Sequence, residues 1–205
     1  MRGITDVDRT FSWLGRFPLA VDLTDTVRVV GDQEIELLED DAALDVWITA
    51  EVPRYPSAQA ARGRLDDVRE LRDLVRKLLS AHVRGESLPA WVIQAINEIS
   101  ARSPSFPVLS TDGDREIIEV NHDQFDLFAA EVARTLIEVI SADSSHIARC
   151  NAPRCGMFFV PKNPRQRWCS PECGNRARVA RHAMRAAGER SSQPGASGGR
   201  KLPPG

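Results

Sequence analysis

The stretch Cys150-Asn-Ala-Pro-Arg-Cys155, followed after thirteen intervening residues by Cys169-Ser-Pro-Glu-Cys173, decides the fold of the C-terminal part of this 205-residue chain. These four residues are the only cysteines in the sequence. Two close pairs separated by a short segment are typical of four-thiolate tetrahedral zinc, because each pair brings two sulfurs together and the segment between them folds back. The spacing therefore predicts a structural zinc site.

Two disulfides or four buried core thiols would use the same residues. Core thiols would be scattered rather than paired, and disulfides are rare in a reducing cytoplasm. The first 21 residues contain charged side chains where a signal peptide needs an apolar core, so we expect a cytoplasmic protein. Neither pair has the two-residue gap of a thioredoxin-like redox motif. Zinc remains the favoured interpretation.

Charge is distributed very unevenly along the chain. Residues 1–148 contain 15 Lys+Arg against 27 Asp+Glu, whereas residues 149–205 contain 12 against 2. The acidic body should repel nucleic acid, and the basic C-terminal part should attract it. No apolar run approaches the ~20 residues of a membrane span, so no membrane partner is expected.

Helical periodicity dominates the N-terminal part, which we predict to be mainly α. Apolar stripes predict helices from Asp40 or Asp41 to Val52, over residues 57–84, over 89–102 and over 123–140. Trp91 and Ile137 are expected to point inward. A hairpin is expected around Asp112-Gly113-Asp114, and residues 1–31 read as a strand or short helix. The predicted domains are a helical body with a small β-hairpin at 1–145, a zinc finger at 146–187 and a disordered tail at 188–205.

Within the finger, residues 157–160 are β-prone and are expected to pair with residues 165–168 across a proline-containing turn. Ser170 is a helix N-cap and Pro171 a first helical residue, which predicts a helix from Pro171 to about Ala187. The last two cysteines then lie at the start of this helix. A knuckle, a hairpin and a ligand-bearing helix resemble a treble-clef zinc finger.

Unrolled at 100° per residue, the helix separates two kinds of arginine. Four residues share one side and are expected to face solvent and contact DNA or RNA: Arg178, Arg181, His182 and Arg185. Arginine is a good fork donor to phosphate and guanine, although a plain solvated face is the alternative. Arg176 falls on the side of Cys173, where we expect it to donate hydrogen bonds to a thiolate; base contact is the alternative.

The run Cys173-Gly174-Asn175-Arg176 resembles the signature of the CGNR zinc finger, as do Arg167-Trp168-Cys169-Ser170 and the residues beside the first two cysteines. The resemblance covers residues 146–187 and implies that all four cysteines are zinc ligands, although the second gap is three residues where some members have four. Residues 19–26 resemble the opening of the ABATE domain, over residues 8–140. This family is considered a stress-induced transcription regulator; Asp25 stands where an Asn is common.

Three functions follow from these observations. The first is a bacterial transcription regulator in which the zinc is structural, the finger binds DNA and the body senses a ligand or partner; a homodimer is expected, because one small finger binds DNA weakly. The second is a protein- or RNA-interaction adaptor. The third is a nuclease, for which His146, Asn163, Asn175 and His182 are suitable residue types, but no convergent carboxylates accompany them. We therefore expect no enzyme. The effector ligand, the DNA sequence and the role of Asp25 stay open.

Overall fold

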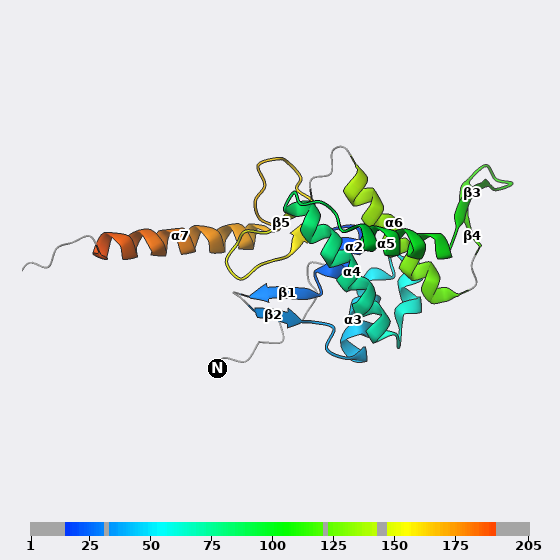
Figure 1. The fold of residues 1–205 in the computed structure, drawn as a ribbon, viewed down its shortest axis with the longest axis horizontal. Helices are drawn as coiled ribbons and strands as arrows, with labels where there is room; N and C mark the ends of the chain where they lie inside the picture. The colour runs from blue at the N-terminus through cyan, green and yellow to red at the C-terminus, as the bar shows by residue number, and fades with distance from the viewer. Residues whose placement is uncertain (1–14, 31–32, 121–122, 143–146, 192–205) are drawn as a thin grey trace, which may run out of the picture.

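The computed structural model describes residues 15–30, 33–120, 123–142 and 147–191. The molecule is elongated, with a helical body in the middle, one long helix projecting at one end and a hairpin at the other (Figure 1). Its elements, in chain order, are α2 Leu19–Thr24, β1 Val27–Val30, β2 Gln33–Glu36, α3 Asp41–Glu51, the 3-10 helix η1 Pro56–Ala61, α4 Leu65–Val83, α5 Ala90–Arg102, β3 Ser105–Leu109, β4 Arg115–Glu119, α6 Gln124–Ser141, β5 Ala148–Arg149, β6 Phe158–Phe159 and α7 Pro171–Ser191.

Helix ends coincide with capping residues that the sequence displays. The Asp40 carboxylate accepts a hydrogen bond from Ala43 N at 2.8 Å, which starts α3. The Asp123 carboxylate accepts from Phe125 N at 2.8 Å and starts α6. Gly85, at φ +67°, lies just beyond the end of α4 in the left-handed conformation that glycine tolerates. The predicted helices corresponding to α3, α5 and α6 are confirmed.

Helix α2 lies at the centre of the body. All six of its residues are buried, and it packs against α4 and α6. Trp47 of α3 meets Phe128 of α6 edge to face, with ring centroids 6.2 Å apart, and closes the core on another side. The short apolar run of residues 19–21 is therefore a buried helix, and residues 27–30 are a strand.

Several expectations about the body were wrong in detail. The predicted helix within 57–84 is two elements, because Gly63 at φ +69° interrupts it between η1 and α4. Trp91 and Ile137 are exposed rather than inward. Trp91 lies beside Lys77, whose Nζ is 5.0 Å from the indole ring, so a cation–π contact takes the place of core burial.

The structure contains three antiparallel two-stranded sheets among the described residues. The β3–β4 hairpin was predicted and is confirmed. The β1–β2 pair, with Val27 opposite Glu36, was not predicted. Helix α7 runs to Ser191 and so enters the stretch expected to be disordered; residues 192–205 lie outside the described part of the chain, as do Phe11, Trp13 and Leu14.

Candidate metal centre and basic helix

The four cysteines come from three elements of the finger. Cys150 directly follows β5, Cys155 lies in the loop before β6, Cys169 lies two residues before α7, and Cys173 lies in the first turn of α7. Their sulfur atoms all lie within 4.8 Å of one another. Among the described residues, no other group of histidine, cysteine or carboxylate side chains gathers in this way.

The spacing of the sulfurs fits zinc. Cys169 Sγ is 3.8 Å from Cys155 Sγ and 3.5 Å from Cys173 Sγ. A tetrahedral zinc ion at about 2.3 Å from each ligand sets the sulfurs about 3.8 Å apart. All four cysteines are free thiols, so the structure does not contain the two disulfides considered as an alternative. Four thiolate ligands close the coordination sphere, and zinc here would supply folding energy rather than an open position for a reaction.

Packing four thiols together changes their acidity. Hydrogen bonding by Cys155 lowers the pKa of the Cys150 thiol to about 6. The same contact with Cys150 raises the pKa of Cys155 above its usual range. Some of the thiols thus ionise readily while others hold their protons, because adjacent thiolates repel one another. A divalent cation at the centre removes this conflict by stabilising every thiolate at once.

The strand pairing beside the cysteines differs from the prediction. Residues 158–159 pair with residues 148–149, not with 165–168. Cys150 N donates to Met157 O at 2.8 Å and continues this ladder. The reason is that the loop carrying Cys155 folds back on β5, whereas the following loop closes on itself through Lys162 N, which donates to Gln166 Oε1 at 2.8 Å. The observed arrangement is a cysteine-bearing hairpin followed by a helix.

Helix α7 starts where the sequence indicates. Ser170 Oγ accepts a hydrogen bond from Cys173 N at 3.3 Å and caps the first turn. Arg176, one turn later, donates from Nη2 to Cys173 Sγ at 2.9 Å. Phe159 and Ala177 fill the small apolar core beneath the sulfurs. Arg176 thus lies against a candidate metal ligand, on the side where the helical periodicity places it.

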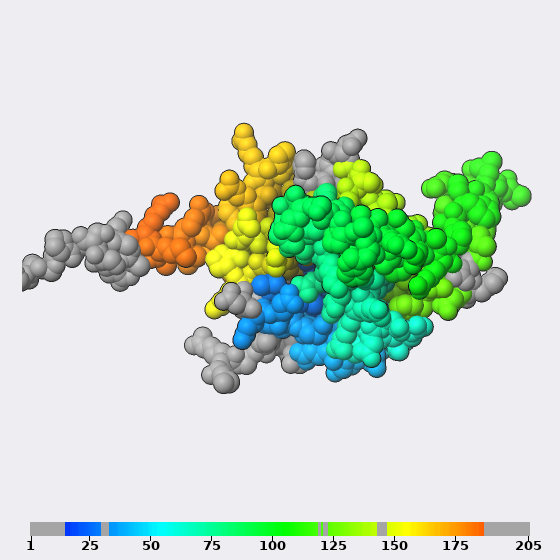
Figure 2. Space-filling view, in the orientation of Figure 1, coloured from blue at the N-terminus to red at the C-terminus, as the bar shows by residue number. Residues whose placement is uncertain are grey.

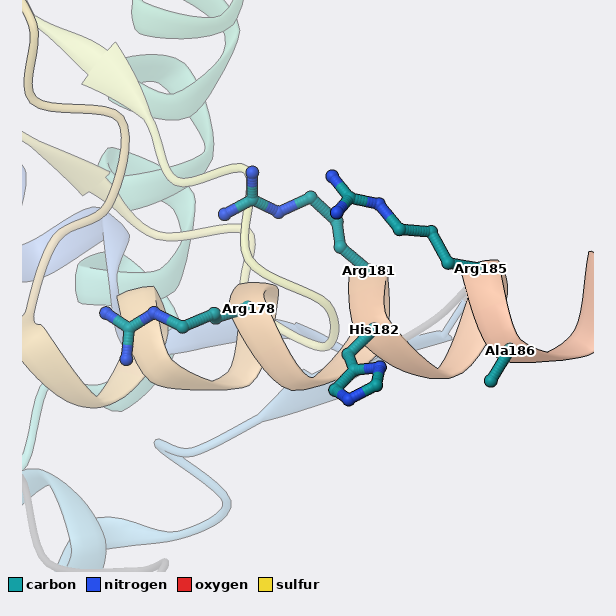
Figure 3. A pocket seen from close by; sticks show the side chains of 5 residues that line it. All are labelled: Arg178, Arg181, His182, Arg185 and Ala186. Atoms are coloured by element: carbon teal, nitrogen blue, oxygen red, sulfur yellow. The ribbon is translucent and has the colours of Figure 1, made fainter.

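The four residues of the outer side are all exposed. Arg178, Arg181, His182 and Arg185 line one surface hollow together with Ala186 (Figure 3). The side chains of Arg181 and Arg185 extend from the same side of the helix, Arg178 reaches back along the helix, and His182 points to another side (Figure 3). The cationic surface is therefore broad rather than a single line.

The candidate nuclease residues do not form a cluster. Asn163 Oδ1 accepts from Arg165 N inside its own loop, and Asn175 Oδ1 accepts from Arg178 Nη1 on the exposed helix. His146 lies outside the described residues. The described part of the finger shows no carboxylate converging on these side chains.

A set of contacts that sequence reasoning missed joins the finger to the body. Asp25, buried at the end of α2, accepts a hydrogen bond on Oδ1 from Phe158 N at 2.8 Å. Its other carboxylate oxygen is buried without a partner. Phe158 belongs to the apolar core of the body. A Cβ on Gly156 would lie 2.6 Å from Val29 Cβ, so only glycine allows the finger to approach β1 this closely.

The burial of Asp25 affects its ionisation. Desolvation raises the pKa of this carboxyl well above its usual value, and the hydrogen bond from Phe158 N only partly opposes the effect. In the sequence, the one sign that position 25 is special is that an aspartate stands where asparagine is common in the ABATE family. An asparagine there could accept the same hydrogen bond without a charge.

Fold and site together define a mainly helical protein that carries a C-terminal four-cysteine metal finger with a basic helix. The family model of the CGNR zinc finger matches residues 146–186. The ABATE model, described as "Putative stress-induced transcription regulator", matches residues 18–143, more than half of the chain. The chain therefore belongs to the ABATE family and has a CGNR zinc finger after the ABATE domain, in the predicted order.

Neither of the two families is described as an enzyme family. A search of curated proteins found no match to the chain. None of the described helices has the length and apolarity needed to cross a membrane.

Proposed function

We propose that this protein is a zinc-dependent DNA-binding transcription regulator, in which the finger binds DNA and the ABATE body senses a ligand or a protein partner. The observation that carries the proposal is the position of the basic helix. Arg178, Arg181 and Arg185 lie exposed on α7, directly beyond a candidate zinc site that fixes the start of this helix.

The electrostatics of the chain support DNA as the partner. The body and the finger have opposite charge, and the arginines of α7 can each neutralise one phosphate. The acidic body should keep its own surface away from the duplex and leave α7 as the contact. His182 is close enough on the same helix to add a hydrogen bond to phosphate or a base edge.

A sensing role for the body needs a place for a ligand. A hollow of about 470 Å³ lies between α4 and α5, where the exposed Trp91 stands near Lys77, Arg76 and Arg84. Glu34, Asp73 and Glu86 also line the hollow, and Arg76 and Arg84 are paired with Glu34 and Glu86 at 2.7 Å. Lys77 beside Trp91 is therefore the cation that a planar ligand with one carboxylate would meet. Titration of the protein with small aromatic carboxylates, followed by Trp91 fluorescence and compared with Trp91→Phe, tests this part separately from DNA binding.

The DNA proposal is tested by replacing Arg178, Arg181 and Arg185 with alanine together. Affinity for duplex DNA should fall, and the log–log dependence on salt should flatten by about 0.9 for each phosphate that is no longer neutralised. Fluorescence anisotropy over a salt series measures both quantities. A triple variant that binds like the wild type would mean that α7 is not the DNA-binding surface.

A matched control removes the same charge from the body. Arg62, Arg64 and Arg102 are exposed arginines far from the finger in the chain, and each lies beside an acidic residue. Their triple alanine variant should bind DNA as well as the wild type or slightly better. Equal decreases in affinity for the two triple variants would indicate a nonspecific effect of net charge.

Arg176→Ala separates metal retention from DNA contact. The change removes the donor to Cys173 Sγ, a loss of roughly 1–3 kcal/mol for a buried charged acceptor left unpaired. Zinc release to a colorimetric chelator should become faster, while DNA affinity of the zinc-loaded protein should change little. Unchanged zinc release would rule out the thiolate role of Arg176.

A protein-docking adaptor is the second candidate. The observation in its favour is that Val179 and Met184, two large apolar side chains of α7, are mostly exposed. Phosphate contacts do not require them, whereas a protein partner would cover them. If the wild type binds neither DNA nor RNA at low salt, the adaptor becomes the better interpretation.

A further inference from the structure

The β3–β4 hairpin exposes an unusual amount of apolar surface. It projects from the body as a separate lobe at the end of the molecule opposite to α7 (Figures 1 and 2). Its exposed apolar side chains are Phe106, Leu109, Ile117, Ile118 and Val120. An isolated two-stranded hairpin is marginally stable in water, and clustered exposed apolar residues mark interaction surfaces.

Two backbone hydrogen bonds at the ends of the hairpin show which backbone groups face outward. Ser110 N donates to Asp114 O at 2.8 Å, and Val120 N donates to Pro104 O at 3.0 Å. Both pairs lie in the register of the hairpin, an even number of residues away from the pair Phe106–Ile118. Hydrogen-bonded and non-hydrogen-bonded pairs alternate along an antiparallel ladder. Pro107 and Ile117 therefore form a non-hydrogen-bonded pair, and their backbone groups point to the two outer edges.

The two edges differ in their ability to add a strand. On the outer edge of β3, Pro107 has no N–H to donate, which blocks pairing there. On the outer edge of β4, Ile117 offers both N–H and C=O, and its side chain is 47% exposed. The hairpin thus has one blocked edge and one open edge, in a sheet of only two strands.

We propose that the open edge of β4 binds β4 of a second copy of this chain, antiparallel and centred on Ile117, so that the two hairpins form one four-stranded sheet. The sequence of β4, Arg115-Glu-Ile-Ile-Glu119, is self-complementary in this register. Ile117 lies opposite Ile117 of the second copy, and Arg115 lies opposite Glu119 at both ends. Opposite charges across strands favour this partner over an unrelated strand.

The proposal also explains why pairing would stop at two copies. Each outer edge of the four-stranded sheet is a β3 edge, where Pro107 lacks the central N–H that a further strand would need, so addition of a further strand is disfavoured. Pro107 and Ile117 of one copy would then lie in one row with Ile117 and Pro107 of the other copy, on one face of the sheet. Because α7 lies at the other end of the molecule, the pairing leaves its arginines uncovered (Figure 1).

Ile117→Pro tests the edge directly. The backbone N–H of Ile117 points away from β3, so proline at this position removes an outward N–H and leaves the hydrogen bonds of the hairpin in place. Pro107, the residue opposite Ile117 on β3, is accommodated in the same way. The full-length wild type should be a dimer in sedimentation equilibrium. The variant should raise the dimer dissociation constant about tenfold or more, since proline removes both central hydrogen bonds of the pair. A monomeric wild type, or a variant that dimerises equally well, overturns the proposal.

Two further comparisons guard against a folding defect. Ser105→Pro places an equivalent proline on the edge that is already blocked, so it should leave the dimer intact; dissociation of this control as well would contradict the assignment of β4 as the open edge. Arg115→Glu and Glu119→Arg should each weaken the dimer, and the two changes together should restore it. Failure of the double variant to recover would rule out this register. None of these outcomes depends on DNA binding.

Discussion

Replacing Asp25 with asparagine should stabilise the protein increasingly as the pH rises. Asparagine can keep the acceptor for Phe158 N, which lies 2.8 Å from Asp25 Oδ1. It removes the buried carboxyl, whose second oxygen has no partner. Desolvation holds the pKa of Asp25 well above its usual value. The substitution therefore separates the hydrogen bond from the cost of charge.

The sign and size follow from proton linkage. A raised pKa in the folded state means that the folded protein binds more protons than the unfolded chain at pH values between the two pKa values. The stability contribution of Asp25 is present below the unfolded pKa and is lost as the pH rises towards the folded pKa. The loss approaches about 1.4 kcal/mol per pH unit. From about pH 5 to pH 7, the asparagine variant should gain up to about 3 kcal/mol over the wild type.

Urea unfolding of both proteins at several pH values, with zinc bound, measures this difference. Asp25→Ala is the matched control, because it removes the charge and leaves Phe158 N without its acceptor. It should be less stable than the asparagine variant by about 1–3 kcal/mol at every pH. A constant difference between wild type and asparagine variant across the pH range would refute the conclusion that burial, rather than hydrogen bonding, controls this carboxyl.

Two other perturbations address how the finger is held. Gly156→Ala should destabilise the chain by about 1–3 kcal/mol in thermal unfolding, because the new Cβ would meet Val29 Cβ at 2.6 Å; Val29→Gly should relieve part of the cost, and simple additivity of the two effects would argue against a steric clash at this position. Cys169→Ser should abolish binding of one zinc per chain in native mass spectrometry and unfold the finger, since structural zinc contributes apparent free energy of about 10–16 kcal/mol in small peptides. Circular dichroism should retain most of the helix signal of the body; its complete loss would mean that body and finger fold as one unit.

Much of the local structure could be predicted from the sequence, because its causes are local. Asp40, Asp123 and Ser170 cap the helices that follow them, since a short polar side chain beside an apolar stripe has few other uses there. The cysteine spacing predicted a cluster that the structure contains. The periodicity of α7 placed Arg176 and the outer arginines on different sides, which is a property of any α-helix.

Errors arose where one periodic pattern covered two environments. Trp91 and Ile137 fit an apolar stripe, but the neighbouring elements do not cover them, and both remain exposed. Apolar spacing reports which residues share a face and not how wide the covered part of that face is. The interruption at Gly63 was likewise hidden, because the residues on both sides continue a helical composition.

The sequence by itself determined the helices α3, α5, α6 and α7, the β3–β4 hairpin, the cysteine cluster and the basic character of α7. Tertiary structure alone decided the partner of β6, the approach of Gly156 to Val29 and the hydrogen bond from Phe158 to Asp25. Asp25 and Phe158 are 133 residues apart, and no periodic pattern or local propensity relates positions at that distance. Such contacts form only because packing of the body brings the end of α2 beside the cysteine-bearing hairpin, where a buried backbone N–H must find an acceptor.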